Sequence, residues 1–165
     1  MLVLGIDPGT AITGYGLVRE DGSGSISAVA YGVITTAAKM PMPQRLLKLY
    51  KELNDIILLH SPDSSAVEKL FFQRNVRTAI SVGQGRGVVL LALADAGVDI
   101  GEYTPLEIKQ AVTGYGGADK VQIQQMVRAL LNLDDIPKPD DAADALAVAI
   151  CHIHSIKMKY LDGDR

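Results

Sequence analysis

The chain has little cysteine and few large aromatic residues: among 165 residues there is one Cys, there is no Trp, and there are two Phe. Cys151 has no partner for an internal disulfide, and one thiol leaves no cysteine-based zinc site, so we expect a reducing compartment. The apolar run at 88–94 is far shorter than the roughly 18–20 residues that a membrane span needs. No basic lead precedes the apolar residues of the opening MLVLGID, as a secretory signal would require. We therefore expect a cytoplasmic protein with no membrane partner.

The chain also lacks an excess of either charge. It has 16 Lys and Arg against 19 Asp and Glu, a net charge of −3, and 48% hydrophobic residues, which is typical of a folded globular protein. No repeat, low-complexity tract or linker is present, and the length fits one domain of roughly 100–200 residues. We expect a single domain over residues 1–158 and a flexible tail over 159–165. The slight negative charge counts against a nucleic-acid binder, unless metal ions neutralise part of the acidic set.

Hydrophobic period and turn residues predict a mixed α/β domain in the order β-β-β-α-β-α-β-α-α-α. Strands are expected at 2–6, 15–19, 26–35, 65–70 and 98–103, and helices at 41–60, 76–96, 105–113, 118–133 and 140–157. Because EDGSGS at 20–25 has the composition of a hairpin loop, the early strands should pair antiparallel and the later ones parallel. Gly83, Gly85 and Gly87 interrupt one helix at about 1 kcal/mol each relative to Ala, so a close contact should offset that cost.

Two carboxylates stand where strands are expected to end. Asp7 follows an apolar strand and precedes Pro-Gly, at the edge of a sheet where α/β folds often bind ligands. Its alternative is an ordinary turn residue. Glu68 interrupts AVEKLFF, a segment otherwise suited to burial, and Glu is seldom buried unless it is paired or bound to metal. Its alternative is a solvent-facing strand position.

A third acidic group lies in DDAADALA at 140–147. Asp141 and Asp144 are three residues apart and share one helix face, where two like charges repel unless a cation lies between them and another partner. Acidic residues in a first turn also complement the helix dipole, which accounts for Asp140 and Asp141 but less well for Asp144. If Asp7, Glu68, Asp141 and Asp144 converge, they form an oxygen-only anionic set suited to Mg²⁺ or Mn²⁺. Two such ions would suit phosphoryl transfer at a phosphodiester.

Basic and aromatic residues follow Glu68 in KLFFQRNVR. Phe71 and Phe72 could stack on bases or wedge between them while Arg74 and Arg77 bind phosphates. Adjacent Phe residues in an extended segment face opposite sides, so at least one could instead belong to the core. Further along the chain, Lys109 and Lys120 flank the glycine-rich GYGG loop. His152 and His154 are two apart on a helix and point in different directions, which argues against a shared metal.

Five motifs, GIDPGTAITGYG, VEKLFF, QGRGV, KQAVTGYGGADK and DDAADALAVAICH, occur in this order. With them the chain resembles the RuvC family of Holliday-junction resolvases over almost its whole length. The resemblance implies a ribonuclease-H-like fold with a five-stranded mixed sheet flanked by helices, and a Mg²⁺-dependent endonuclease. The family's four carboxylates fall on Asp7, Glu68, Asp141 and Asp144. Asp140 adjoins this set, but the spacing to Asp144 favours Asp141.

The resemblance also implies roles and partners. Asp7 would bridge two Mg²⁺ ions, for which Mn²⁺ could substitute, Glu68 would bind one ion, and Asp141 and Asp144 the other. Water would displace the 3′ oxygen and leave a 5′ phosphate. The family's aromatic residue matches Phe71, and its two lysines match Lys109 and Lys120. Members act as homodimers that nick a four-way DNA junction symmetrically, alongside the RuvA–RuvB branch-migration complex, and the helix around 83–87 resembles their dimer helix.

Three other functions start from the same features. The GIDPGT turn is similar to the phosphate loop of actin-like and sugar-kinase ATPases, but those proteins need two such lobes, and this chain has the length of one. A junction-binding module without catalysis would be favoured by loss of a carboxylate, and none is missing. A shorter ribonuclease-H-like nuclease acting on ribosomal RNA precursors is disfavoured by DDAADALA and by the aromatic and basic residues after Glu68. No GxxxxGK[ST] motif of a P-loop nucleotide-binding protein is present.

Overall fold

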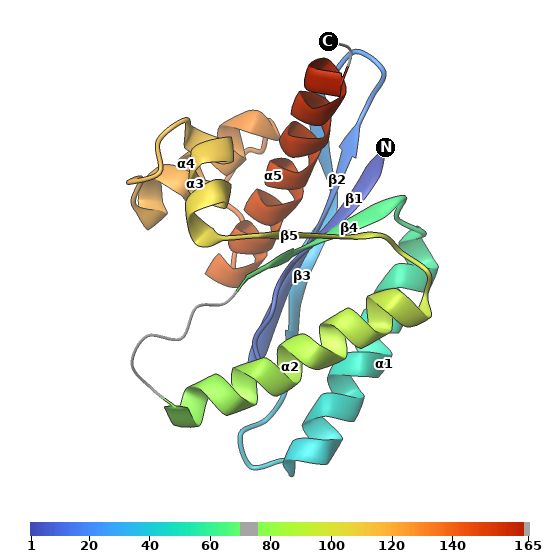
Figure 1. The fold of residues 1–165 in the computed structure, drawn as a ribbon. Coiled ribbons are helices and arrows are strands. Elements are labelled where there is room, and N and C mark those ends of the chain that lie inside the picture. The colour runs from blue at the N-terminus through green and yellow to red at the C-terminus, as the bar shows by residue number, and fades with distance from the viewer. Residues whose placement is uncertain (70–75, 164–165) are drawn as a thin grey trace.

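The computed structural model describes residues 1–69 and 76–163, and the side chains of 1–69 and 78–158 (Figure 1). Its elements follow one another in the predicted order, three strands first and three helices last. No helix in the described part of the chain is long and apolar enough to cross a membrane.

A five-stranded sheet forms the centre of the domain. Its strands are β1 (Leu2–Asp7), β2 (Ile12–Glu20), β3 (Ile26–Thr35), β4 (Ser64–Glu68) and β5 (Ile100–Tyr103). They lie side by side in the order β3-β2-β1-β4-β5. The first three pair antiparallel, whereas β4 and β5 continue parallel to β1. The predicted mixed sheet is therefore confirmed.

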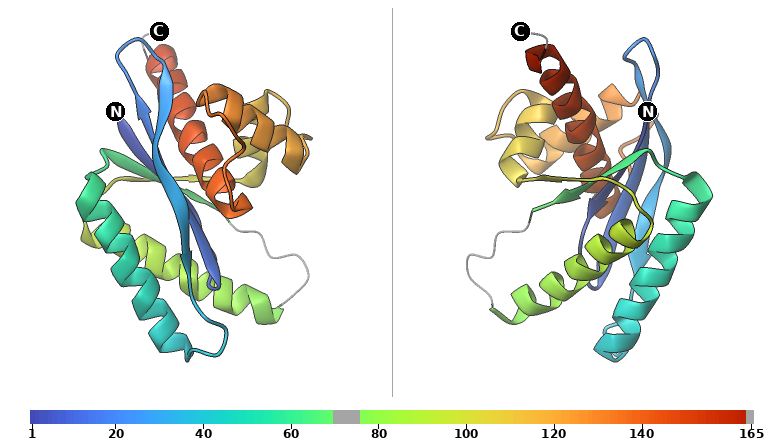
Figure 2. Two further views of the ribbon diagram at one scale, coloured as in Figure 1. Left: turned by 180° about the vertical axis from the view of Figure 1, so that it is seen from behind. Right: turned by 45° about the vertical axis from the view of Figure 1, so that its right-hand side comes forward.

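Helices cover both faces of this sheet (Figure 2). They are α1 (Met42–His60), α2 (Val76–Asp95), α3 (Pro105–Thr113), α4 (Lys120–Leu130) and α5 (Asp140–Gly163). The pair α1 and α2 lies on one face, where it buries Leu4, Ile6 and Val67. On the other face α5 runs along the strands, and α3 and α4 pack beside it. Each face has its own apolar core.

Several element boundaries differ from the sequence prediction for local reasons. Helix α4 begins at Lys120 and not at 118, because Asp119 and Gln122 form a capping box that fixes its first turn. The predicted start of α3 is correct, and there too a capping box forms, between Thr104 and Glu107. Helix α5 continues to Gly163 and so enters the segment 159–165 that we expected as a flexible tail. No Gly or Pro interrupts that segment before Gly163, so nothing local ends the helix earlier.

Helix α5 packs directly on glycines of the sheet. A Cβ atom at Gly5 would overlap the carbonyl oxygen of Ala145, one at Gly14 the carbonyl oxygen of Asp141, and one at Gly16 would lie 2.8 Å from the side chain of Leu146. Only glycine therefore lets the helix backbone come this close to β1 and β2. This close approach brings the start of α5 to the end of β1.

The three glycines of α2 do not share one environment. A Cβ atom at Gly85 would lie 3.2 Å from the carbonyl oxygen of Gly9, whereas Gly83 and Gly87 face open space. The expected close contact is therefore confirmed for Gly85 and wrong for Gly83 and Gly87 within this chain, since those two lie on the exposed side of the helix.

The glycine contact with α5 yields a stability prediction. Gly5→Ala should lower the free energy of unfolding by about 1–3 kcal/mol, because the added methyl must displace the backbone of α5. Gly22→Ala is the control, since a Cβ atom there would meet nothing within 4 Å. Its effect should stay within about 0.5 kcal/mol. Urea denaturation followed by circular dichroism measures both, and equal stability of the two variants would contradict the packing argument.

Candidate functional site

Asp7 and Glu68 lie next to each other at the carboxyl ends of two parallel strands. Ile6 of β1 is in register with Val67 of β4. The next residue of each strand is a carboxylate, Asp7 in β1 and Glu68 in β4, so the two lie side by side. Both side chains are mostly buried, and their carboxyl groups share a hydrogen bond. Neither residue is the solvent-facing turn or strand residue that the sequence left open.

Asp141 and Asp144 approach this pair from α5. The carbonyl oxygen of Asp141 lies over Gly14, the β2 residue paired with Asp7, so the first turn of α5 stands above the end of β1. Asp144 is one turn further along and partly buried. Both carboxylates act electrostatically on Asp7. The structure therefore brings together all four predicted acidic residues, which come from three separate parts of the chain.

Burial and, after it, crowding change the pKa values of these carboxylates. Burial, followed by repulsion from Glu68 and Asp144, raises the pKa of Asp7 from 3.8 to about 8. Burial also raises the pKa of Glu68, although the hydrogen bond from Asp7 opposes the shift. The pKa of Asp144 is raised by burial too, against the opposing effect of the Lys120 ammonium group. At neutral pH the isolated protein therefore keeps a proton within the acidic group.

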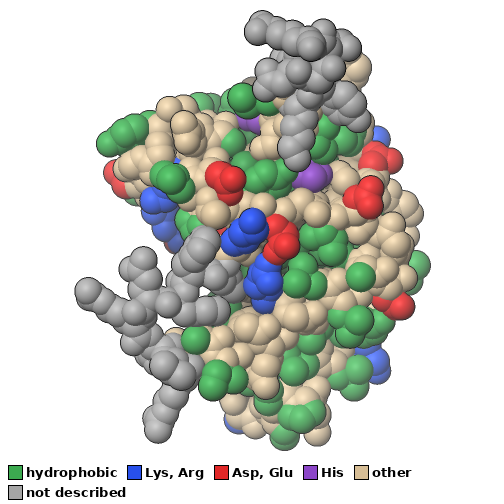
Figure 3. Space-filling view, in the orientation of Figure 1, with side chains coloured by type: hydrophobic (Ala, Val, Ile, Leu, Met, Phe, Trp, Pro, Cys, Tyr) green, Lys and Arg blue, Asp and Glu red, His purple; other side chains and the backbone are tan. Residues whose placement is uncertain are grey.

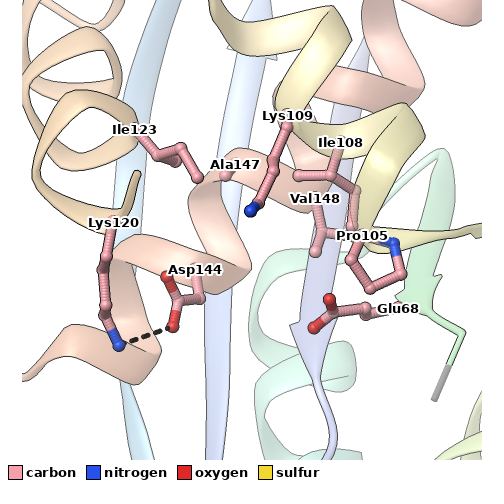
Figure 4. A pocket seen from close by; sticks show the side chains of 9 residues that line it. All are labelled: Glu68, Pro105, Ile108, Lys109, Lys120, Ile123, Asp144, Ala147 and Val148. Atoms are coloured by element: carbon pink, nitrogen blue, oxygen red, sulfur yellow. Dashed lines mark hydrogen bonds and ion pairs between the residues drawn. The ribbon is translucent and has the colours of Figure 1, made fainter. Parts of the chain in front are cut away.

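Two lysines border a cavity next to the acids (Figure 4). The cavity has a volume of about 200 Å³ and lies among α3, α4, α5 and the end of β4. Glu68 and Asp144 are its acidic lining residues, Lys109 and Lys120 its basic ones, and Ile108 and Val148 are among its apolar ones. A cavity lined by acids, lysines and apolar side chains can accept a cationic group at the acids and an anionic group at the lysines.

Lys120 forms ion pairs with two acidic residues at the start of α5. Its Nζ atom lies 3.3 Å from Oδ2 of Asp144 and 3.3 Å from Oδ2 of Asp140. Burial lowers the pKa of Lys120, but these two partners together outweigh it and raise the pKa, so the lysine carries its positive charge at the site. The role of Asp140 as a partner of this lysine, not of the carboxylate set, was not predicted from the sequence. The only local signal for this role was the capping box of Asp119 and Gln122, which orients Lys120 at the start of α4.

Basic and acidic side chains lie close together near the middle of the face seen in Figure 3. A further ion pair joins Arg86 of α2 to Glu102 of β5. This pair lies on the α2 side of the sheet, opposite the acids, because Glu102 is in register with Val67 and not with Glu68. The ion pair joins α2 to the edge strand of the sheet.

The carboxylates fit a divalent metal by chemistry and need a rearrangement to bind it. Among the side chains that the structure describes, at 1–69 and 78–158, no three acidic, His or Cys side chains already converge on one point at metal-binding distance. Asp7 and Glu68 are joined by a hydrogen bond, and Asp144 faces Lys120. The donors are nevertheless all carboxylate oxygens, the ligands that Mg²⁺ and Mn²⁺ prefer. A bound ion would have to displace the shared proton and the lysine ion pair from these carboxylates.

The remaining predicted residues have different outcomes. Lys109 and Lys120 line the cavity as described. Phe71, Phe72 and Arg74 lie outside the described residues, and of Arg77 only the backbone is described, in the first turn of α2. His152 is buried between Tyr103 Oη and Ser64 Oγ, at 2.9 and 3.1 Å from its ring nitrogens, whereas His154 bonds the carbonyl oxygen of Ala111. These separate partners agree with the argument against a shared metal.

The raised pKa of Asp7 predicts how stability depends on pH when no metal is present. The folded protein keeps the proton of Asp7 up to about pH 8, whereas the unfolded chain releases it near 3.8. Between these values the folded state binds more protons, so the free energy of unfolding should fall as the pH rises. Asp7→Asn should flatten this slope and stabilise the protein at pH 8 by at least about 1 kcal/mol, since one pKa unit corresponds to about 1.4 kcal/mol.

Urea unfolding in EDTA at several pH values tests this prediction. Asp55→Asn serves as the control, because Asp55 is exposed on α1 and should leave the slope unchanged. A wild-type slope that Asp7→Asn does not alter would mean that Asp7 is ionised in the folded protein.

Comparison with known proteins supports one family. A family model described as "Crossover junction endodeoxyribonuclease RuvC" matches residues 3–152. The protein of that name from Desulfitobacterium hafniense (strain DSM 10664 / DCB-2) is 62% identical over 158 residues, covering 96% of this chain and 95% of its own length. The one from Chloroflexus aggregans (strain MD-66 / DSM 9485) is 59% identical over 155 residues, with 94% of each chain covered.

Solved structures agree with the sequence relatives. A structure of "T. thermophilus RuvC in complex with Holliday junction substrate" superposes with a TM-score of 0.88 at 33% identity, covering 96% of both chains. A second Thermus thermophilus RuvC structure gives a TM-score of 0.90 at 35% identity, covering 96% of this chain and 97% of that one. The predicted ribonuclease-H-like fold is thereby confirmed. The chain belongs to the RuvC family of crossover junction endodeoxyribonucleases.

Proposed function

We propose that this protein is a metal-dependent endodeoxyribonuclease that resolves four-way (Holliday) DNA junctions by symmetric paired nicks, in recombination and DNA repair. Its relatives are named as crossover junction endodeoxyribonucleases, and the T. thermophilus structure contains a Holliday junction substrate. The observation that carries the proposal is the convergence of Asp7 and Glu68 with the first turns of α5. Four carboxylates gathered beside two lysines suit phosphodiester hydrolysis better than binding alone, because clustered acids repel DNA unless cations neutralise them.

The chemistry follows from the charges of the site. Asp7, Glu68, Asp141 and Asp144 would together hold the ions, with Asp7 as the carboxylate that the other three act on. When bound, two Mg²⁺ ions, for which Mn²⁺ could substitute, would supply the Lewis acidity that activates water and stabilises the leaving oxygen. Lys120, held beside Asp144, would balance charge that develops on the phosphate. Water would form a new bond to phosphorus as the 3′ oxygen leaves, which gives a 5′ phosphate and a 3′ hydroxyl.

DNA would lie across the cavity and the segment that follows β4. Lys109 and Lys120 supply positive charge at the cavity, and Arg74 and Arg77 would bind phosphates further along the strand. Phe71 and Phe72 would stack on or separate bases at the junction centre. In this arrangement the net charge of −3 is no obstacle, because the acidic residues that oppose DNA are those that the ions neutralise.

The exposed side of α2 supports a homodimer. Ile80 and Leu91 are 61% and 59% exposed on it, and Gly83 and Gly87 between them face open space. Such an apolar face with small residues lets a second helix approach closely. Two copies related by a twofold axis would present two sites to the two symmetric strands of a junction. Action with the RuvA–RuvB complex in the cytoplasm completes the proposal, by analogy with the family.

Cleavage of a labelled synthetic four-way junction tests the activity. The junction is incubated with Mg²⁺, with Mn²⁺ and with EDTA, beside linear duplex and single-stranded controls. We expect symmetric nicks on the junction only, and only with a metal. Binding without nicks under either metal would favour a structural junction binder, and nicking of structured RNA in preference would favour the RNA-nuclease alternative.

Asp7→Asn should abolish cleavage while junction binding persists. The carboxylate serves metal binding more than DNA affinity, and loss of a metal-bridging ligand should slow cleavage by at least about 100-fold. Single-turnover cleavage and a gel-shift titration measure the two effects, with Asp55→Asn as the exposed control. Metal-dependent cutting by Asp7→Asn at the wild-type rate would refute the assigned role.

Leu91→Glu should convert the dimer to monomers. A charge placed at Leu91, at one end of the exposed apolar face of α2, would have to be buried against the second helix and would oppose pairing by several kcal/mol. Light scattering gives the mass, and a supercoiled plasmid with an extruded junction separates paired from single nicks, of which the paired ones should fall more. Leu58→Glu on α1 is the control, because Leu58 is 78% exposed on another surface. A Leu91→Glu protein with the wild-type mass would remove α2 from the interface.

A further inference from the structure

The turn at 8–11 joins β1 to β2 and follows Asp7 directly. Two threonine hydroxyls tie it to the sheet. Thr13 Oγ1 donates to the carbonyl oxygen of Gly9 at 2.5 Å, and Thr36 Oγ1 donates to the carbonyl oxygen of Thr10 at 2.5 Å. Thr36 in turn accepts from Nε of Arg45 at 2.8 Å. These bonds fix the backbone of the turn relative to β2 and β3.

A third hydroxyl ties the same turn to a helix. Thr10 is 7% exposed, and its Oγ1 atom donates to the carbonyl oxygen of Ser81, in the interior of α2. An interior helix carbonyl already has an intrahelical partner four residues further on, so helix formation does not require this bond. The contact depends on Gly85, because a Cβ atom there would lie 3.2 Å from the Gly9 carbonyl oxygen and 3.3 Å from Thr10 Oγ1. The helix therefore lies directly against the turn.

We propose that Thr10 is a positioning residue for Asp7. Its hydrogen bond to α2 fixes the turn at 8–11 against that helix, and thereby fixes the position of the Asp7 carboxylate relative to Glu68, Asp141 and Asp144. This inference rests on the proposed nuclease function. Asp7 is the last residue of β1 and pairs with Gly14, and the turn at 8–11 continues its backbone directly. The other three carboxylates repel it, and a repelled ligand needs a fixed backbone to stay within reach of shared ions.

A Thr10→Val substitution distinguishes positioning of Asp7 from a hydrogen bond that only satisfies the buried hydroxyl of Thr10. If Thr10 only satisfied its own polar group, Val would cost stability and leave the chemistry unchanged. If it positions Asp7, Val should slow cleavage and weaken the response to metal in protein that is folded and binds DNA. A displacement of about 1 Å at a reacting group costs up to about 100-fold in rate. We therefore expect a loss of about tenfold or more from Thr10→Val.

The test compares Thr10→Val with Thr10→Ser and wild type. Single-turnover cleavage of the four-way junction is measured with saturating enzyme across a Mg²⁺ titration, together with junction affinity in EDTA and thermal unfolding. Thr10→Val should cleave about tenfold slower and need more Mg²⁺ for half its maximal rate, while affinity changes less than about twofold. Thr10→Ser should restore both values. Ser155→Ala is the control, since it also removes a hydroxyl bonded to a helix carbonyl, that of Cys151 at 2.7 Å, far along α5.

Two outcomes would overturn the inference. Thr10→Val could cleave with the wild-type rate and Mg²⁺ dependence, or Thr10→Ser could be as impaired as Thr10→Val, which would make side-chain shape and not the hydroxyl responsible. If Thr10→Val does not fold, Gly85→Ala decides, because the added methyl pushes the same contact apart and should give the same loss of rate at unchanged affinity. Wild-type protein that fails to cut any junction would instead refute the proposed function.

Discussion

The close approach of α5 to the sheet is the contact on which the site depends. Helix and strands lie nearly backbone to backbone, because Gly5, Gly14 and Gly16 carry no side chain where the helix passes. The helix contributes small residues in return, and Ala142 and Ala145 are fully buried. Larger residues on either surface would lift α5 and carry its two aspartates away from Asp7. The glycines thus help to bring the four acidic residues together through the packing of the core.

Gathering four acids at this contact opposes stability. The isolated protein reduces the repulsion in two ways: Asp7 and Glu68 share a hydrogen bond, and Lys120 forms ion pairs with Asp140 and Asp144. A divalent ion could take the place of the proton between Asp7 and Glu68 and of the lysine ammonium group beside Asp144. Under the proposed function, mutual repulsion of the acids destabilises the site without metal and a bound ion relieves that repulsion, as is common where function and not stability has selected the residues. Metal binding and folding should in consequence stabilise each other.

Much of this could be predicted from the sequence. The alternating and helical periods gave the element order, and the four acids stood out because Glu68 and Asp144 occupy segments otherwise suited to a core. Three features could not be read in this way. The pairing of Lys120 with Asp140, the hydroxyl of Thr10 on α2 and the ion pair of Arg86 with Glu102 all join residues at least 16 positions apart. Such contacts depend on how elements pack and leave no periodic signal. The different surroundings of Gly83, Gly85 and Gly87 arise from the same cause, since only the packing of α2 decides which glycine meets the turn.

The central claim is that the end of β1 and the start of α5 form one metal site. Crystals soaked in Mn²⁺, with diffraction recorded at the manganese absorption edge, test it directly. The account predicts two anomalous peaks about 3.5–4 Å apart, both in contact with Asp7, one also with Glu68 and the other with Asp141 and Asp144. Peaks elsewhere, or none at these carboxylates in a crystal that binds Mn²⁺ at other sites, would contradict it.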